Sequence, residues 1–469
     1  MERFDVVAVG AGPTGLLLAS ELALGGAKVV VLERLTEIDR TMKAGAVGVL
    51  AAEALVRRGL GAAIEAAEAK MLEAFVAMQK QSGVAPNLDR FKKIGGHFAG
   101  LFLIDQSRQR EPERRFRGVN QQLLEGLLGE HARASGVEVR RGTPLAGFRA
   151  NEDGVLVNES IEAAWLVGCD GGRSPVRKLA GFAFEGTAPT VVGHQAVVQL
   201  DHPERLLPLG WRRTAHGMMA YGPTPGRIAT VEFTGPPSSR EAEITKEEIE
   251  ASIRNVSGAD VRVLSMESAT RWTDHARLAD SYRKGRVFLA GDAAHVHSPF
   301  GGQGLGLGLL DAVNLGWKLA GVIRGDFAES ILDTYTQERR PVAAAVLENT
   351  RAQVALMRPD EQTGALREIV ARFMDTDEGT RFFGEMMSGI RTRYDLGDEN
   401  PVVGTLSRDL ADVVVATNDE EESVAREFRV RIMRGEEPRY VRPDGCIAWA
   451  GGAGLREALA RWAPKAAMR

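Results

Sequence analysis

The chain has 469 residues, which is enough for roughly two to four folded units. Its residues are 44% hydrophobic and 26% charged, as in globular proteins, and 59 basic against 63 acidic residues give a net charge of -4. This balance speaks against a mainly electrostatic nucleic-acid binder. With two cysteines, no signal-peptide pattern and no apolar run long enough to span a bilayer, we expect a cytoplasmic protein that contacts neither membrane nor nucleic acid.

Glycine is the outlier in the composition, with 53 residues or about 11%, and the glycines lie in clusters. The first cluster, GAGPTG at 10–15, follows an apolar run at 4–9 and precedes a helical pattern at 16–24. A second apolar run at 28–32 ends at Glu33. The order predicts a strand, a tight turn, a helix and a parallel strand.

This first cluster is suited to a dinucleotide. Its glycines allow a tight turn and a close approach of the backbone to a pyrophosphate at the helix N-terminus. Glu33 is spaced to accept hydrogen bonds from ribose hydroxyls. The alternative is a glycine-rich turn without a ligand, and the motif alone does not separate NAD from FAD. The cofactor-binding residues predicted here are Gly10, Gly12, Pro13, Thr14, Gly15 and Glu33.

The next part of the chain continues an α/β pattern. Helical periodicity returns near 50–59 and 120–134, and strands are expected at 137–140 and 164–167. The charged stretch 106–117 is interpreted as a solvated loop, with the alternative that its arginines receive an NADPH phosphate.

From about residue 190 to 271 the pattern changes to β-rich segments with one helix at 246–255, which predicts an inserted sheet domain. The α/β core resumes with a strand at 286–290 and a helix at 305–323, and helices continue to about 387. Short β segments then return, and a last helix is expected at 455–462.

Two further glycine clusters, with a third motif close behind the second, select the cofactor. The chain reads GCDGGRS at 168–174, then GDAAH at 291–295 and PFGGQG at 299–304. With these motifs, residues 1 to about 350 resemble the flavoprotein monooxygenases of the p-hydroxybenzoate hydroxylase type. The chain looks most like the aromatic-polyketide (angucycline and anthracycline) hydroxylases, a branch that also resembles rifampicin and tetracycline monooxygenases. The resemblance implies a Rossmann-like fold that binds FAD, an inserted β-rich substrate domain, and NAD(P)H as a co-substrate without a fold of its own.

The resemblance also implies roles for single residues. Asp292 accepts hydrogen bonds from the ribityl chain, and Asp170 contacts both FAD and the nicotinamide cofactor, unless it only caps a turn. The backbone of Gly301–Gly304 opens a helix, approaches the flavin ring and stabilises negative charge on its pyrimidine side, and Gly304, Leu305 and Gly306 are assigned to cofactor binding. The positions assigned to the reaction, which supply shape and backbone contacts and no nucleophile, are Pro299, Gly301 and Gly302.

The chain departs from the family pattern at two places. Where the family usually has an arginine ten residues past the acid of the Glu33-Arg34 pair, this chain has Lys43, which keeps the charge but loses the guanidinium fork. The alternative for Lys43 is a surface lysine. The helix opening LGLG at 305–308 lacks the asparagine of many relatives, so only backbone contacts survive there. Gln121 matches a family glutamine beside the ribityl chain, although Gln122 adjoins it.

Other candidate functional residues have less support from the sequence. His295 and His297 lack an evident third ligand, so no metal site is predicted, and Cys169 is interpreted as a small buried hydrophobe. Weak candidates for substrate contact, which packing explains at least as well, are His216, Met218, Met219 and Tyr221.

The expected division of the chain is discontinuous. Residues 1–70, 98–180 and 276–395 form the FAD-binding domain, and 71–97 with 181–275 form the substrate domain. Residues 396–469 resemble the thioredoxin-like C-terminal domain of the polyketide hydroxylases, mainly through YVRPDGCIAW at 440–449. This segment lacks a Cys-x-x-Cys pair and is short, so we interpret it as a reduced structural appendage.

The implied reaction is hydroxylation of an aromatic, polycyclic polyketide-like molecule by O2 and NAD(P)H through a flavin C4a-hydroperoxide. The partners expected are a small aromatic substrate and O2, with a homodimer possible. Two alternatives stay open: an antibiotic-inactivating monooxygenase of the rifampicin or tetracycline type, and a flavoprotein that binds FAD without turnover.

Overall fold

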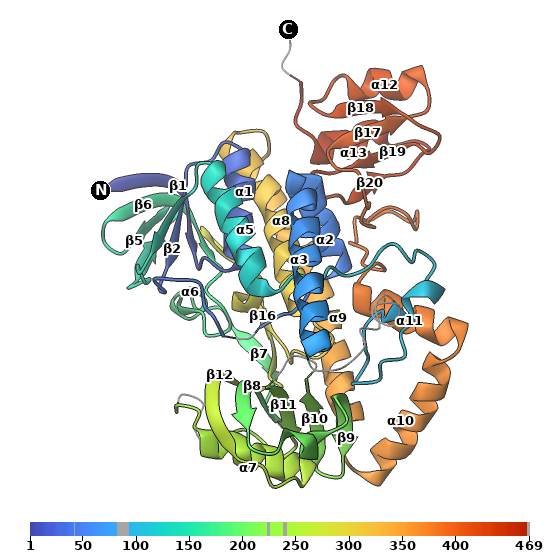
Figure 1. Ribbon diagram of the computed structural model, residues 1–469. Coiled ribbons are helices and arrows are strands. Elements are labelled where there is room, and N and C mark those ends of the chain that lie inside the picture. The colour runs from blue at the N-terminus through green and yellow to red at the C-terminus, as the bar shows by residue number, and fades with distance from the viewer. Residues whose placement is uncertain (42, 82–92, 223–225, 238–241, 467–469) are drawn as a thin grey trace.

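The computed structural model describes residues 1–41, 43–81, 93–222, 226–237 and 242–466. Three blocks follow one another in space: an α/β body, a sheet domain at its lower end, and a C-terminal sheet at its upper end (Figure 1). The mixed α/β class expected from the sequence is confirmed.

The sheet of the α/β body has the order β14-β15-β6-β1-β2-β3, with β4 and β5 attached through β6. Neighbours from β15 to β3 pair in parallel, and the central strands are apolar and buried because helices or loops cover the sheet. The strands are β1 (Glu2–Val9), β2 (Val29–Glu33), β3 (Glu138–Arg141), β4 (Phe148–Ala150), β5 (Val155–Val157), β6 (Ile161–Gly168), β14 (Arg283–Lys284) and β15 (Val287–Leu289).

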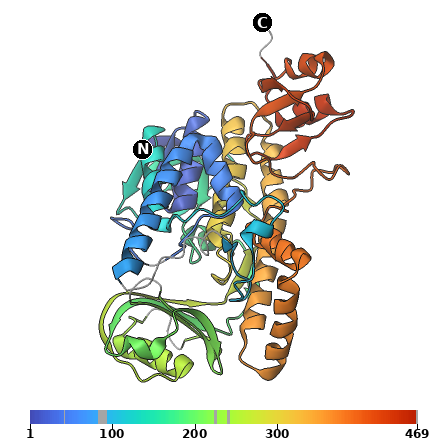
Figure 2. The same ribbon diagram turned by 45° about the vertical axis from the view of Figure 1, so that its right-hand side comes forward.

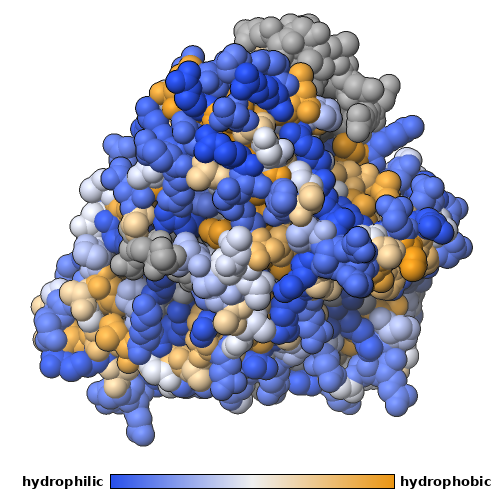
Figure 3. Space-filling model, turned by 90° about the horizontal axis from the view of Figure 1, so that it is seen from below, coloured by the Kyte–Doolittle hydropathy of each residue, from blue (hydrophilic) through white to orange (hydrophobic). Residues whose placement is uncertain are grey.

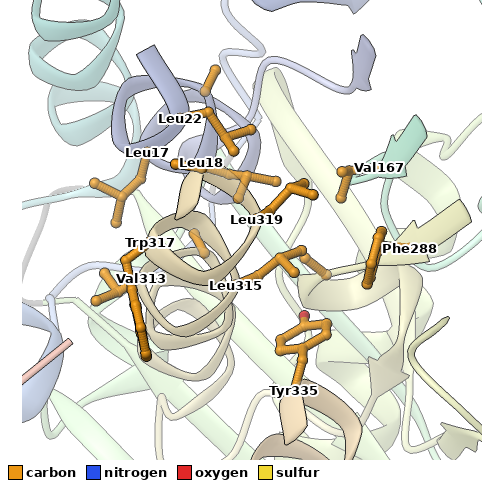
Figure 4. Packing of buried hydrophobic residues seen from close by; sticks show 14 of the residues in the cluster. Leu17, Leu18, Leu22, Val167, Phe288, Val313, Leu315, Trp317, Leu319 and Tyr335 are labelled. Carbon is orange, nitrogen blue, oxygen red and sulfur yellow. The ribbon is translucent and has the colours of Figure 1, made fainter. Parts of the chain in front are cut away.

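The helices of this body pack on one another beside the sheet (Figure 1). Leucines of α1 meet apolar residues of α8, and Phe288 and Tyr335 close the same cluster (Figure 4). Burial of these side chains supplies most of the driving force for this layer. The helices are α1 (Pro13–Leu24), α2 (Val49–Leu55), α3 (Gly61–Gln81), α5 (Gln121–Ala134), α6 (Pro175–Leu179) and α8 (Gly304–Ile323).

The α8 helix is long and apolar enough to cross a membrane, but 78% of its apolar window is buried inside the structure. It is the central helix of the core, which explains its composition.

The inserted domain is an antiparallel sheet with the order β12-β8-β11-β10-β9, covered on one face by α7 (Lys246–Ser257). A small sheet, β16-β13-β7, links it to the body. The strands are β7 (Phe184–Thr187), β8 (Val192–Leu200), β9 (Gly210–Thr214), β10 (Gly217–Tyr221), β11 (Arg227–Glu232), β12 (Val263–Thr273), β13 (Ala276–Ala279) and β16 (His295–Val296). The outer face of this region is mostly hydrophilic, with smaller hydrophobic areas (Figure 3).

Three consecutive helices run beside the body and the inserted domain: α9 (Asp333–Met357), α10 (Glu361–Met374) and α11 (Asp377–Ser388) (Figure 2). An apolar layer lies between these helices and the face of the sheet opposite α7. The loop that follows β16 contributes Phe300 to this layer.

The C-terminal sheet has the order β18-β17-β19-β20. Its elements are β17 (Val413–Ala416), α12 (Asp419–Ala425), β18 (Arg431–Arg434), β19 (Arg439–Val441), β20 (Ile447–Trp449) and α13 (Leu455–Trp462). Its core is continuous with that of the body, and fully buried Arg442 donates to Glu338 of α9 at 2.7 and 2.9 Å.

Two expectations need correction. The α3 helix continues across the expected domain boundary at 70/71 and ends only at Gln81. The stretch 106–117 is only partly a solvated loop: residues 110–113 are exposed, but Arg114 is nearly buried and paired with Glu53, and Arg108 is paired with Asp377 of α11.

Candidate functional site

The predicted residues converge on one edge of the parallel sheet. The motifs at 10–15, at Glu33, at 168–174 and at 291–295 all follow the carboxyl ends of parallel strands, namely β1, β2, β6 and β15. In open α/β sheets this edge is where ligands bind.

The first turn leaves its backbone accessible. Gly10 has a φ of +107°, and a Cβ there would lie 2.3 Å from the Cys169 carbonyl oxygen. At Gly12, by contrast, an added Cβ would meet no atom of the described residues within 4 Å. Pro13 begins α1, and Gly12 caps it without a side-chain hydrogen bond. The free N–H groups and the open space fit a pyrophosphate.

Glu33 fastens this turn to the second strand. Its carboxylate accepts from the N–H of Ala11 at 2.7 Å and from the N–H of Leu35 at 2.8 Å. Glu33 is half-buried at the edge, whereas Arg34 is exposed. A carboxylate has about four acceptor positions, so Glu33 keeps capacity for ribose hydroxyls.

Thr14 joins the first turn to the later motifs. A Cβ on Gly291 would lie 2.9 Å from Thr14 Oγ1, and a Cβ on Gly308 would lie 2.5 Å from the same atom. Absence of side chains at these two glycines therefore lets α1, the turn at 291–293 and α8 meet at Thr14.

Asp292 projects from this junction. It is exposed, although Gly291 and Ala293 on either side are buried. The exposed carboxylate is free of the core and available to hydroxyl groups of a cofactor.

A buried ion network holds the turn that carries Asp292, and the sequence reasoning missed it. Asp311 of α8 accepts from the N–H of Gly291 at 3.1 Å and pairs with His295 at 2.7 Å. Arg339 donates to Asp311 at 2.7 Å and to the Leu307 carbonyl at 3.0 Å. Burial opposes ionisation of Asp311, but Arg339 and His295 outweigh it and lower the pKa of this carboxyl below its ordinary value.

Asp170 lies at the same edge, after β6, the strand between β1 and β15. One oxygen accepts from the N–H of Val176 at 3.0 Å, and the other is buried without a hydrogen-bond partner among the described residues. Burial raises the pKa of Asp170. Arg177 donates to the Gly172 and Ala293 carbonyls, both at 2.8 Å, and so ties this motif to the turn at 291–293.

The loop at 299–304 leads into α8. Pro299 is exposed, Gly301 and Gly302 have φ values of +84° and +64°, and Phe300 packs edge-on against Trp272 at 5.3 Å. The helix begins at Gly304 without a side-chain cap, so its first N–H groups, including those of Leu305 and Gly306, can stabilise negative charge on a flavin ring.

The Lys43 side chain is exposed and forms an ion pair with Asp39. Its Nζ lies 2.9 Å from Asp39, and burial of Asp39 is outweighed by hydrogen bonds from Thr41 and Lys43, which lower the pKa of Asp39 to about 2. Nearby, the Gln122 amide donates to the Thr41 carbonyl at 2.6 Å.

Gln121 is the half-buried first residue of α5, and its backbone N–H donates to the Ala44 carbonyl at 2.9 Å. Because the Gln122 amide already has a partner in the Lys43 loop, Gln121 is the better placed of the two glutamines for a cofactor.

The expected substrate residues are placed less favourably. His216 is exposed at the turn between β9 and β10. Met219 and Tyr221 pack in the cluster under α7, on the face of the sheet away from Phe300. Met218, in contrast, belongs to the layer that contains Phe300. Strand alternation therefore places Met218, and not Met219 or Tyr221, on the face of the sheet that carries Phe300.

The arrangement fits FAD. The open space at Gly12, the buried Asp170 oxygen without a partner, the exposed Asp292 and the uncapped α8 lie along one edge. A dinucleotide with an extended middle and a ring system is the group that uses all of them.

Comparisons with known proteins agree with this arrangement. The family model described as FAD binding domain matches residues 3–350. A rifampicin monooxygenase of Streptomyces venezuelae is 40% identical over 417 residues, covering 87% of this chain and 83% of that protein. The 12-dehydrotetracycline 5-monooxygenase/anhydrotetracycline 6-monooxygenase of Streptomyces rimosus is 36% identical over 520 residues, covering 98% and 99%.

A solved structure of the OxyS anhydrotetracycline hydroxylase from Streptomyces rimosus superposes with a TM-score of 0.82 and 35% identity, covering 99% of this chain and 100% of that one. The chain belongs to the FAD-binding-domain family and, within it, to the FAD-dependent monooxygenases. FAD is its cofactor, and NAD(P)H is the co-substrate of this class.

Proposed function

We propose that this enzyme hydroxylates a polycyclic, polyketide-like aromatic molecule with O2 and NAD(P)H. The observation that carries the proposal is the apolar layer beside Pro299 and Phe300. It contains Trp272, Met218 and, from α9 to α11, further apolar side chains packed against one another, and in this proposal a flat apolar ligand lies against these aromatic and thioether groups.

The edge of the parallel sheet would hold the cofactor. In this proposal the N–H groups at 10–15 take the pyrophosphate, Glu33 takes the ribose, and Asp292 with Gln121 takes the ribityl chain. The start of α8 faces the pyrimidine side of the ring, with Pro299, Gly301 and Gly302 beside it.

FAD, when bound, supplies the redox chemistry and the activation of oxygen. The residues of the chain bind the FAD, orient the substrate and exclude water. The α8 N-terminus stabilises negative charge, the Phe300–Trp272 contact keeps the layer dry, and the network around Asp311 holds Asp292 in place.

The nicotinamide cofactor is proposed to approach at the Asp170 motif. Desolvation there raises the pKa of Asp170. The nearby Arg177 donates hydrogen bonds to two backbone carbonyls and so holds the motif in a fixed position. Arg173 is exposed beside it.

The C-terminal segment, 396–469, is proposed to be a thioredoxin-like remnant. The proposal is supported by a parallel β17-α12-β18 unit followed by an antiparallel β19-β20 hairpin and α13, an order of elements similar to that of thioredoxin without the helix between its two halves. Its role is structural, because Arg442 anchors it to Glu338.

Two relatives are named for rifampicin and for tetracycline intermediates, so the test uses rifamycins, tetracycline precursors and angucycline-type aromatics. We expect at least one of them to stimulate NAD(P)H consumption and to gain one oxygen atom by mass. Consumption without an oxygenated product across all three groups would contradict the proposal.

A matched pair of variants tests the position of the substrate. Met218 and Met219 are both fully buried neighbours on β10 but face opposite sides of the sheet. Met218→Ala should raise KM for the best substrate several-fold, whereas Met219→Ala should cost stability and leave KM unchanged. An equal effect of both variants on KM would place the substrate elsewhere.

A further inference from the structure

A hollow lies beside the loop that carries Pro299. It encloses about 170 Å³ between the segment 187–190, the end of β12 and the C-terminal half of α9. This volume is below the roughly 300–1,000 Å³ of a complete ligand pocket, so the hollow suits one end of a ligand. Val354 and Ala355 give it an apolar wall.

The mouth of the hollow is positively charged. Arg351 of α9 and Arg358, the residue that follows the end of this helix, both line it, and within the part of the chain that the structure covers neither guanidinium has a carboxylate partner. Asp274 also lines the hollow, but its oxygens accept from the Thr190 N–H and hydroxyl at 2.7 Å and from the Val191 N–H at 2.9 Å. The hollow is therefore lined by two arginines without a carboxylate partner in the described ranges and by one carboxylate whose oxygens already accept hydrogen bonds. This excess of positive charge leaves a site for an anion.

The wall of the hollow also contains a buried polar residue. Ser298 lines it, is only 2% exposed, and has a hydroxyl without a hydrogen-bond partner among the residues described. A buried hydroxyl without a partner is costly, and a ligand group would satisfy it. Ser298 immediately precedes Pro299, so the hollow adjoins the loop assigned to the flavin face.

We propose that this hollow is an anion subsite, which binds an acidic group of the aromatic substrate such as a carboxylate or an ionised phenol. The inference rests on the proposed hydroxylation of an aromatic molecule and names a property of its substrate. Arg351 and Arg358 select the charge, Val354 and Ala355 contact the attached ring, and the Ser298 hydroxyl contacts its polar edge.

Calorimetric titration of the FAD-loaded protein with two matched probes tests this subsite. The probes are 1-naphthoate and 1-naphthalenemethanol, which differ in charge and hardly in shape. We expect naphthoate to bind about tenfold more tightly. In the double variant R351Q/R358Q this preference should vanish, whereas Arg372→Gln, an exposed arginine on the neighbouring α10, should keep it. Ser298→Ala should weaken both probes.

The outcomes separate the subsite from the proposed function. Equal binding of the two probes, or a preference that persists in R351Q/R358Q, would overturn the subsite even if the enzyme transfers oxygen. A double variant with a raised KM for NADPH but not for NADH would identify the anion as the 2′-phosphate of the nicotinamide cofactor and would also overturn the assignment to the substrate. A lost preference with both cofactor KM values unchanged supports it, whether or not the proposed aromatic class is hydroxylated.

Discussion

Asp311 lies 2.7 Å from His295, and neither side chain has any exposed surface. The pair connects the middle of α8 to the segment that follows the exposed Asp292. Because Asp311 also accepts from Gly291, one carboxylate holds both ends of the turn that presents Asp292. Cofactor binding should therefore depend on a residue that does not itself reach the cofactor.

Asp311→Asn should weaken FAD binding and destabilise the fold together. The substitution leaves the buried Arg339 without its carboxylate, and breaking a buried pair costs about 3–5 kcal/mol. Urea unfolding of the apoprotein and fluorescence titration with FAD measure the two effects. Normal FAD affinity in a folded variant would show that the turn does not need Asp311.

Asp292→Ala should weaken FAD binding without changing the stability of the fold. Its side chain is exposed and outside the core, so unfolding of the apoprotein should be unchanged. A hydrogen bond to a charged group contributes about 1.5–3 kcal/mol, so FAD affinity should fall about ten- to 150-fold. Unchanged affinity would contradict the assignment of Asp292 to the cofactor.

Lys43→Ala should slow reduction of the flavin by NAD(P)H, whereas Lys43→Arg should be tolerated or improve retention of FAD. The loss of one partly exposed charge contact costs on the order of 1 kcal/mol, which corresponds to a several-fold change. Asp39→Asn is the control, since it removes the ion pair and leaves the Lys43 charge. If Lys43→Ala matches the parent in reduction rate and FAD content in stopped-flow experiments, Lys43 is a surface lysine.

Stability should depend on pH through Glu68 of α3. Burial opposes its ionisation, but hydrogen bonds from Arg115, Gly118 and Arg117 outweigh it and lower its pKa from 4.5 to about 2. The ionised group therefore stabilises the fold fully above pH 4.5, and the contribution is lost as the pH falls toward 2.

Glu68→Gln should consequently lower the free energy of unfolding by about 1 kcal/mol at neutral pH. The difference from the parent should shrink below pH 4.5. Urea unfolding of both proteins at neutral and acidic pH measures it, and a difference independent of pH would rule out the charge as its cause.

Local patterns predicted much of the fold. The strand, turn and helix around Gly10–Gly15 depend on neighbouring residues, and the sequence shows them directly. The motifs at Asp170 and Asp292 were found as glycine clusters, and the family resemblance gave these two residues their roles; parallel pairing then brings both motifs to one edge.

Contacts between distant residues explain what the sequence did not show. Arg114 pairs with Glu53, 61 residues away, so the charge pattern at 106–117 alone suggested a solvated loop. Arg442 pairs with Glu338, 104 residues away, and no local pattern indicated this contact. On β10 both Met218 and Met219 are buried, and without polar alternation the facing side cannot be read from the sequence.

The most direct test supplies isotopically labelled O2 to the FAD-loaded enzyme with NAD(P)H and a polycyclic aromatic substrate, and follows the product by mass spectrometry. The account predicts a product that carries one labelled oxygen atom, formed in proportion to NAD(P)H consumed, and formed less efficiently in the Met218→Ala variant. A product whose new oxygen comes from water, or NAD(P)H oxidation that yields only hydrogen peroxide with every aromatic tested, would contradict it.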